Sequence, residues 1–197
     1  MRFLIAVVLV FSLGCSPKEL PEDTDQIMSL TAKQATDLVA KFEDEYLSLR
    51  GLTSIDKDVA HELAKFAGGA LWLNGLTSID KDVAQELAKF EGRTLFLNGL
   101  TSVDKDVAQE LVKVEGGYLS LNGLNSINKD VAQELAKFKA EKLALTGLTS
   151  IDKDIAQELA KVEGGLLYLH DLASIDKDVL KILKSNPEII LPEKYSD

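Results

Sequence analysis

Carboxylate and imidazole side chains are the groups in this sequence that could do metal or acid–base chemistry. Asp56 and Asp58 flank a lysine, and the same Asp-Lys-Asp triplet returns further along the chain. Calcium loops place oxygen ligands at alternate positions but also need a glycine at the turn. Here Val59 and Ala60 follow, and the triplet opens a predicted helix. Capping of that helix explains both aspartates, so we predict no metal site.

The two histidines lack the partners that catalysis requires. His61 stands where other copies of a repeat have glutamine, which predicts a solvent-facing side chain, and His170 takes the place of Asn74. Neither has a cysteine, serine or second histidine at a spacing that suits a nucleophile–base pair. No G-x-S-x-G, H-E-x-x-H or glycine-rich phosphate loop is present. We therefore predict a protein that is not an enzyme and has no catalytic residue and no cofactor.

Aromatic and amide side chains form the remaining candidate site. They fall at alternate positions of short predicted strands, where they would face away from the core. Trp72 and Phe96 would lie side by side, with Tyr118 one strand further on. The candidate binding face consists of Trp72, Phe96, Tyr118, Tyr168, Asn74, Asn98 and Asn122.

Two interpretations of this candidate binding face stay open. Exposed rings with neighbouring amides suit a peptide, a protein loop or a sugar, because the rings supply apolar area and the amides orient the partner. Alternatively, the asparagines serve only the turns that follow the strands, and Trp72 and Phe96 shield one another across the sheet.

A repeat of 24 residues positions all these side chains. One leucine marks the same place in six successive copies: Leu49, Leu73, Leu97, Leu121, Leu145 and Leu169. Leu71 and Leu73, separated by one outward residue, predict a short half-buried strand. Asn74 and Gly75 follow it, and both tolerate the positive φ of a tight turn.

A helix completes each copy. Asp80 is a good N-cap residue, and apolar side chains recur at i, i+4 and i+7 as Val83, Leu87 and Phe90. The side chains predicted to face water are Gln85, Glu86 and Lys89. Gly92 is expected to end the helix as a C-cap glycine.

The order strand, loop, helix predicts an α/β solenoid. Parallel strands stack at ~4.8 Å, whereas helices are roughly 10 Å wide. The stack should therefore bend, with short parallel strands on the concave side and helices on the convex side.

The pattern L-x-L-x-x-L-x-x-I-D followed by an amphipathic helix resembles the leucine-rich repeat family. The match is carried by Leu71, Leu73, Leu76, Ile79 and Asp80 and extends from about Thr31 to Leu191. It is most similar to the variant with a helical convex side. Leu76 stands where the family has Asn or Cys, which implies that the buried side-chain ladder of that position is missing. Gly68 replaces a further leucine.

The first residues predict export. In residues 1–14, Arg2 gives a positive start and Phe3–Leu13 is apolar except for Ser12; the run is too short for a bilayer span, which indicates a signal peptide. Ser-Leu-Gly-Cys at residues 12–15 resembles the lipobox of bacterial lipoproteins, so Cys15 is the predicted lipidation site. The alternative is an ordinary signal peptide with an incidental cysteine. Residues 15–29, with two prolines and many charges, predict a lipidated cysteine and tether.

Residues 30–197 are predicted to form the solenoid. Residues 30–46 have a helix without a preceding strand and would form the N-terminal cap. Residues 47–185 hold six repeats, and residues 186–197 form a C-terminal cap in which Ile189–Leu191 add an edge strand.

The net charge of −10 excludes some partners. It argues against nucleic acid, which needs a basic patch, and against adhesion to anionic lipid except through the anchor. The predicted function is a non-catalytic protein-binding or scaffolding module, exported and lipid-anchored in the bacterial cell envelope, whose concave sheet meets an unidentified protein. The alternatives are a structural envelope protein without a dedicated ligand and a carbohydrate-binding module on the same face.

Overall fold

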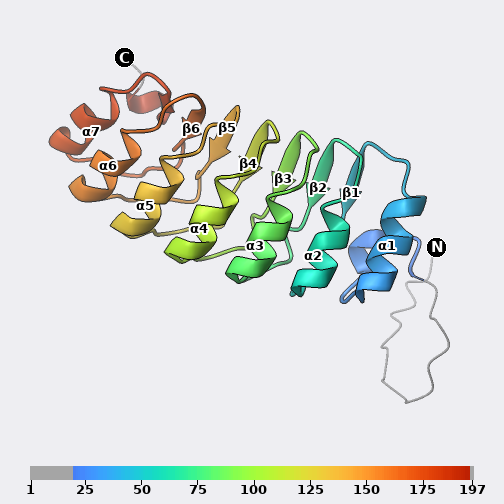
Figure 1. Ribbon diagram of the computed structural model, residues 1–197. Coiled ribbons are helices and arrows are strands. Elements are labelled where there is room, and N and C mark those ends of the chain that lie inside the picture. Colours follow the sequence, from blue (N-terminus) through green and yellow to red (C-terminus); the bar gives the residue numbers. More distant parts are fainter. Residues whose placement is uncertain (1–19, 196–197) are drawn as a thin grey trace, which may run out of the picture.

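The computed structural model describes residues 20–195, which form one continuous stack of α/β units (Figure 1). Figure 1 shows the helices in one row and the strands in a second layer behind it, with α1 and α7 at opposite ends. The strands are β1 (Tyr46–Ser48), β2 (Ala70–Trp72), β3 (Thr94–Phe96), β4 (Tyr118–Ser120), β5 (Lys142–Ala144), β6 (Leu166–Tyr168) and β7 (Ile189–Ile190). The α-helices are α1 (Ala32–Lys41), α2 (Lys57–Leu63), α3 (Lys81–Leu87), α4 (Lys105–Leu111), α5 (Lys129–Leu135), α6 (Lys153–Leu159) and α7 (Lys177–Leu183). Two 3-10 helices, η1 (Thr24–Gln26) and η2 (Glu193–Tyr195), lie near the ends.

The strands form one parallel sheet in the order β1 to β7. From β1 to β6, Cα partners are 24 residues apart, for example Leu47 with Leu71 and Leu71 with Leu95, whereas Leu167 of β6 pairs with Ile189 of β7. The predicted α/β solenoid, with helices between parallel strands, is confirmed. Register is fixed because a shift by one residue would move every inward leucine to the outer face.

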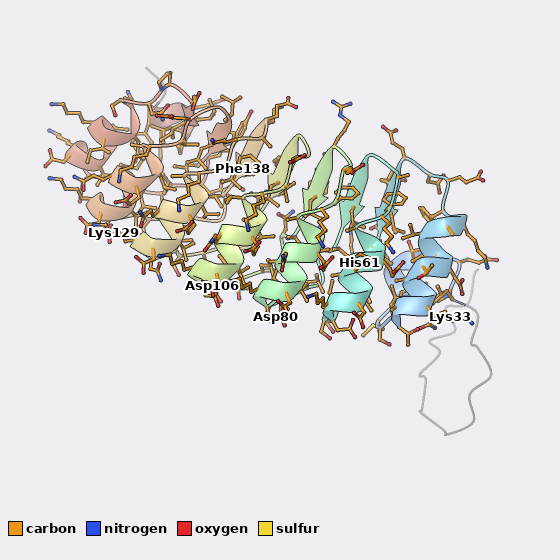
Figure 2. The ribbon with its side chains drawn as sticks, viewed as in Figure 1. Lys33, His61, Asp80, Asp106, Lys129 and Phe138 are labelled. Carbon is orange, nitrogen blue, oxygen red and sulfur yellow. The ribbon has the colours of Figure 1, made fainter. Side chains whose placement is uncertain are left out.

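A single apolar core runs between the two layers. Leu71, Leu73 and Leu76 are fully buried in it, and the same positions of the other repeats are buried with them. The predicted helix stripe faces this core, since Val83, Leu87 and Phe90 are buried. Figure 2 shows the corresponding Phe138 between the helices and the sheet.

The first aspartate of the Asp-Lys-Asp triplets caps a helix, as predicted, except at α7, where the Asp176 side chain makes no capping bond. The backbone N–H of Val83 donates to Asp80 Oδ1 at 2.8 Å, and Asp56, Asp104, Asn128 and Asp152 accept the same bond in their repeats. Asp80, Asp106 and Lys129 lie along one edge of the helix row (Figure 2). The side-chain oxygens of Asp80 and its equivalents therefore accept from helix N–H groups that would otherwise lack a partner.

The prediction that Glu86 faces water is wrong. Glu86 is only 5% exposed, and the equivalent Glu110, Glu134 and Glu158 are also buried. Each pairs with the lysine three residues later, as Glu86 does with Lys89 Nζ at 2.7 Å. A charged group persists at this buried position because a lysine ammonium compensates it.

The glycines have a different role from the predicted one. Among the described residues only Gly164 has a positive φ, at 94°, so the positive-φ turn at Gly75 and the C-cap at Gly92 are wrong. A Cβ on Gly75 would lie 2.2 Å from the carbonyl oxygen of Arg50, and one on Gly92 would lie 2.5 Å from that of Gly68. Glycine is needed because the backbones of adjacent repeats approach each other closely.

Both ends of the stack are closed. At the N-terminal end, α1 begins with a capping box in which Thr31 and Gln34 bond each other's backbone N–H. Residues 20–29, which we assigned to the tether, instead lie against the first repeat, and Ile27 is 2% exposed. At the other end β7 pairs with β6, as predicted for the edge strand.

The predicted signal peptide and Cys15 lie outside the described residues. Among residues 20–195, no helix combines the length and the apolar character that a membrane crossing needs.

Candidate functional site

Four aromatic side chains form a continuous row on the outer face of the sheet. Ring centroids are 6.1 Å apart for Tyr46 and Trp72, 5.0 Å for Trp72 and Phe96, and 5.8 Å for Phe96 and Tyr118. The last two pairs meet edge to face, a favourable geometry for aromatic rings. We call Tyr46, Trp72, Phe96 and Tyr118 the aromatic row. Tyr46 was not among the predicted binding residues, although it holds the same strand position as Tyr118, and it is 58% exposed.

A hollow of about 420 Å³ opens beside the aromatic row. Tyr46 lines its β1 end and Lys142 its β5 end, and Trp72, Phe96 and Tyr118 lie between them. Small residues contribute the space between the ends: Gly69, Ala70, Thr94 and Gly117. The side opposite Trp72 and Phe96 has the charged residues Glu45, Arg93 and Glu141, and Lys142 follows Tyr118 on β5. This volume lies in the range of small-ligand and side-chain pockets, roughly 300–1,000 Å³.

Trp72 is poorly explained by stability alone. Its Nε1 atom is buried and makes no hydrogen bond within the described part of the chain. A buried donor without a partner costs about 1–3 kcal/mol relative to a bonded one. The Arg50 guanidinium lies 4.2 Å from the ring centroid, a cation–π contact that contributes ~0.5–1 kcal/mol at an exposed site. The contact with Arg50 therefore offsets only part of the cost of the unpaired donor, and the ring contacts with Tyr46 and Phe96 add to it.

The three asparagines of the candidate face join successive repeats, and we call them the asparagine ladder. Asn74 Oδ1 accepts from the backbone N–H of Asn98, and Asn98 Oδ1 accepts from that of Asn122, both at 3.0 Å. Asn122 Oδ1 accepts from Thr146 N–H at 3.1 Å, and Asn98 Oδ1 also accepts from the Ser120 hydroxyl. A side-chain ladder therefore exists, at the position of Asn74 rather than Leu76. These oxygens are occupied within the protein, which leaves the aromatic row as the main contact surface.

Asp25 begins the same pattern at the N-terminal end. Its Oδ1 accepts from the Ser48 hydroxyl at 2.6 Å and from Arg50 N–H at 3.0 Å, as Asn98 does from the equivalent groups three repeats later. Burial by itself raises the pKa of Asp25, but the hydrogen bonds from Ser48 and Arg50 and the charge of Arg50 bring it below the ordinary value. No full repeat precedes β1 in the described residues, and Asp25 of the segment before α1 supplies the acceptor that an asparagine supplies further along the stack.

Tyr168 does not join the aromatic row. It lies on β6, where its ring meets His170 at 5.2 Å. Between it and Phe96 stand Ser120 and Ala144, which are almost fully buried although they belong to the same outward column. The structure therefore brings Trp72, Phe96 and Tyr118 together and leaves Tyr168 as a separate feature.

His61 is exposed, as predicted, and its side chain is also paired. Its Nδ1 lies 2.8 Å from Glu86 Oε2, so the ring links α2 to α3. Hydrogen bonds from Lys89 and His61 hold the pKa of the Glu86 carboxyl below its ordinary value, against the opposing effect of burial. This cluster is on the helix side, away from the aromatic row.

Acid should weaken the protein partly through Glu86. A carboxyl with a lowered folded-state pKa binds fewer protons in the native state, so its contribution is complete above the unfolded pKa of about 4.3. That contribution is lost as pH falls through the lower folded-state pKa. We expect urea unfolding at pH 6 and pH 3 to show a smaller loss of unfolding free energy in Glu86→Gln than in the wild type. Equal losses in the two proteins would contradict this role.

Residues 20–195 contain no group of three or more His, Cys, Asp or Glu side chains placed to hold a metal ion. A scan of the chain against models of known protein families found no match, and neither did a search of curated protein sequences. The features that bear on function are therefore the fold and the aromatic row with its hollow.

Proposed function

We propose that this chain is a non-catalytic protein-binding or scaffolding module of the bacterial cell envelope, and that it binds its partner with the outer face of the sheet. The observation that carries the proposal is the aromatic row beside a hollow of about 420 Å³. Aromatic side chains in such a surface contribute much of the binding energy of protein interfaces.

The uniformity of the repeats supports this proposal. Inward positions are leucine in every copy, whereas the middle outward column runs Ser48, Trp72, Phe96, Ser120, Ala144 and Tyr168. Packing against the core does not dictate these outward residues, because they lie on the other side of the sheet. Large rings are gathered over β1 to β4, so a partner would contact the N-terminal half of the sheet.

The repeat pattern and the stacked α/β units together support assignment to the leucine-rich repeat type. The lipobox-like residues 12–15 further support a lipoprotein, exported by residues 1–14 and anchored through Cys15. The anchor has a direct test, which is metabolic labelling with radioactive palmitate in a bacterial host. Label should appear on the wild type and be absent from Cys15→Ser; label on both proteins would contradict lipidation at this residue.

Loss of the aromatic row should abolish partner capture. In a pull-down from detergent-solubilised envelope, Trp72→Ala combined with Phe96→Ala should lose the partner that the wild type retains, because two central anchors of a contact surface are removed. Mass spectrometry identifies the captured protein, and a thermal melt shows that the variant remains folded.

Tyr168→Ala is the matched control, since it removes an aromatic ring from the same sheet face outside the hollow. It should capture the partner as the wild type does. Equal capture by all three proteins would place the contact elsewhere, and no specific capture by the wild type would favour a structural envelope protein without a dedicated ligand.

A further inference from the structure

The hollow runs across the strands, which restricts what it can hold. Tyr46, Ala70, Thr94 and Tyr118 all line it, and they are successive Cα partners on β1, β2, β3 and β4. A chain lying in the hollow is therefore perpendicular to the strands and on the face of the sheet. It cannot add to the sheet as a further strand, so its own backbone receives no ladder hydrogen bonds.

Hydrogen-bond donors in the hollow are unused. The guanidinium of Arg93, the hydroxyl of Thr94 and the phenol groups of Tyr46 and Tyr118 make no hydrogen bond or ion pair with another residue in the range 20–195. They suit a ligand that is rich in acceptors and poor in donors. Proline-rich chains have this character, because proline has a carbonyl acceptor but no backbone N–H.

Charges alternate along the side of the hollow opposite Trp72. Glu45, Arg93 and Glu141 hold the same position in the first, third and fifth repeats, and the repeats between have Gly69 and Gly117. The glutamate side chains lie over these glycines, since a Cβ on Gly117 would be 3.0 Å from Glu141 Oε2 and one on Gly69 3.8 Å from Glu45 Oε1. Arg93 is therefore the cation at the centre of this line, with a carboxylate on either side, while Lys142 at the β5 end of the hollow lies 4.0 Å from Glu141 Oε1.

The spacing of this line matches one chain conformation. Positions two strands apart are separated by ~9.6 Å at the usual strand spacing. A polyproline II helix advances ~9.3 Å per turn of three residues, so every third side chain would meet every second strand. An extended β-strand covers a similar distance in three residues, but its residues i and i+3 point to opposite sides. An α-helix rises ~5.4 Å per turn, which does not match this spacing.

We propose that the hollow binds a proline-rich segment in the polyproline II conformation, and that Arg93 pairs with a carboxylate of that segment. This inference rests on the proposed function, for which it supplies the class of partner. Proline rings would pack against Tyr46, Trp72, Phe96 and Tyr118, since aromatic-lined grooves bind this preformed helix at a low entropic cost. The free hydroxyl and phenol groups would donate to its carbonyl oxygens.

Synthetic peptides test the proposal with the full chain. The probe is a fluorescein-labelled, blocked nine-residue peptide of proline with a single glutamate at its centre, and fluorescence anisotropy measures its binding. Two further peptides replace glutamate by lysine or proline by glycine. Unlabelled peptide should also change the emission of Trp72, which is the only tryptophan.

We expect saturable binding of the glutamate peptide and at least ~10-fold weaker binding of the lysine peptide, because a charge-assisted hydrogen bond is replaced by repulsion. The glycine peptide should bind several-fold more weakly, since it is not preorganised. Arg93→Gln should weaken binding of the glutamate peptide ~10-fold. Arg50→Gln is the matched control, because Arg50 lies on the same face but does not line the hollow, and it should keep the preference for glutamate.

Equal affinity of the wild type for the glutamate and lysine peptides would overturn the proposal, as would an unchanged affinity in Arg93→Gln or no saturation up to a few millimolar peptide. The proposed function fails separately. Partner capture that depends on Trp72 and Phe96, without any peptide binding, would retain the binding module and exclude a proline-rich ligand.

Discussion

Leu97→Ala should lower the free energy of unfolding by ~2–5 kcal/mol, the usual cost of removing a fully buried leucine side chain from a core that cannot collapse. Leu97 is 0% exposed and lies between the equivalent Leu73 and Leu121 in a continuous apolar core. Its backbone N–H also donates to the carbonyl oxygen of Ser120 at 2.9 Å, which holds the surrounding backbone in place. The cavity should therefore remain largely unfilled.

Urea unfolding followed by far-UV circular dichroism measures this effect. Repeats are stabilised mainly by their nearest neighbours, so damage in the middle should also broaden the transition as the two halves begin to unfold separately. Thr101→Ala is a control in the same repeat at an exposed position, and it should change the unfolding free energy by less than about 0.5 kcal/mol. A loss below about 1 kcal/mol for Leu97→Ala would contradict a single continuous core.

Gly99→Ala should cost roughly 1–3 kcal/mol although it adds a single methyl group. An ideal Cβ at this position lies 2.2 Å from the carbonyl oxygen of Asn74 and 2.5 Å from that of Leu76. Both atoms belong to the backbone of the preceding repeat, so no side-chain rotation relieves the clash. The repeats must separate, which would also strain the bond from Asn98 N–H to Asn74 Oδ1.

Gly69→Ala is the matched control, because a Cβ there meets its nearest atom at 3.4 Å, an ordinary contact. Its unfolding free energy should stay within about 0.5 kcal/mol of the wild type. Chemical unfolding of both variants under identical conditions makes the comparison. Similar losses in the two variants would mean that flexibility of the unfolded chain, and not close approach of the repeats, explains the glycines.

The sequence by itself determined the fold class and the arrangement of the repeats. Leucines recurring every 24 residues can all reach one core only if successive strands pair in parallel at that offset, and the observed partners Leu47, Leu71 and Leu95 do so. Asp80 and its equivalents identified the helix starts because capping is a local interaction, complete within four residues. The alternation within each strand likewise placed Trp72 next to Phe96.

Only the tertiary structure decided how one repeat meets the next. Burial of Glu86, the crowding at Gly75 and Gly99, and the ladder from Asn74 to Asn98 all involve atoms of two adjacent copies. The separation of the copies follows from packing along the whole stack, and the pattern of a single copy does not contain it. Packing between repeats also decides that Tyr46 joins the aromatic row while Tyr168 does not. The hollow that carries the proposed function likewise forms only where adjacent strands lie side by side.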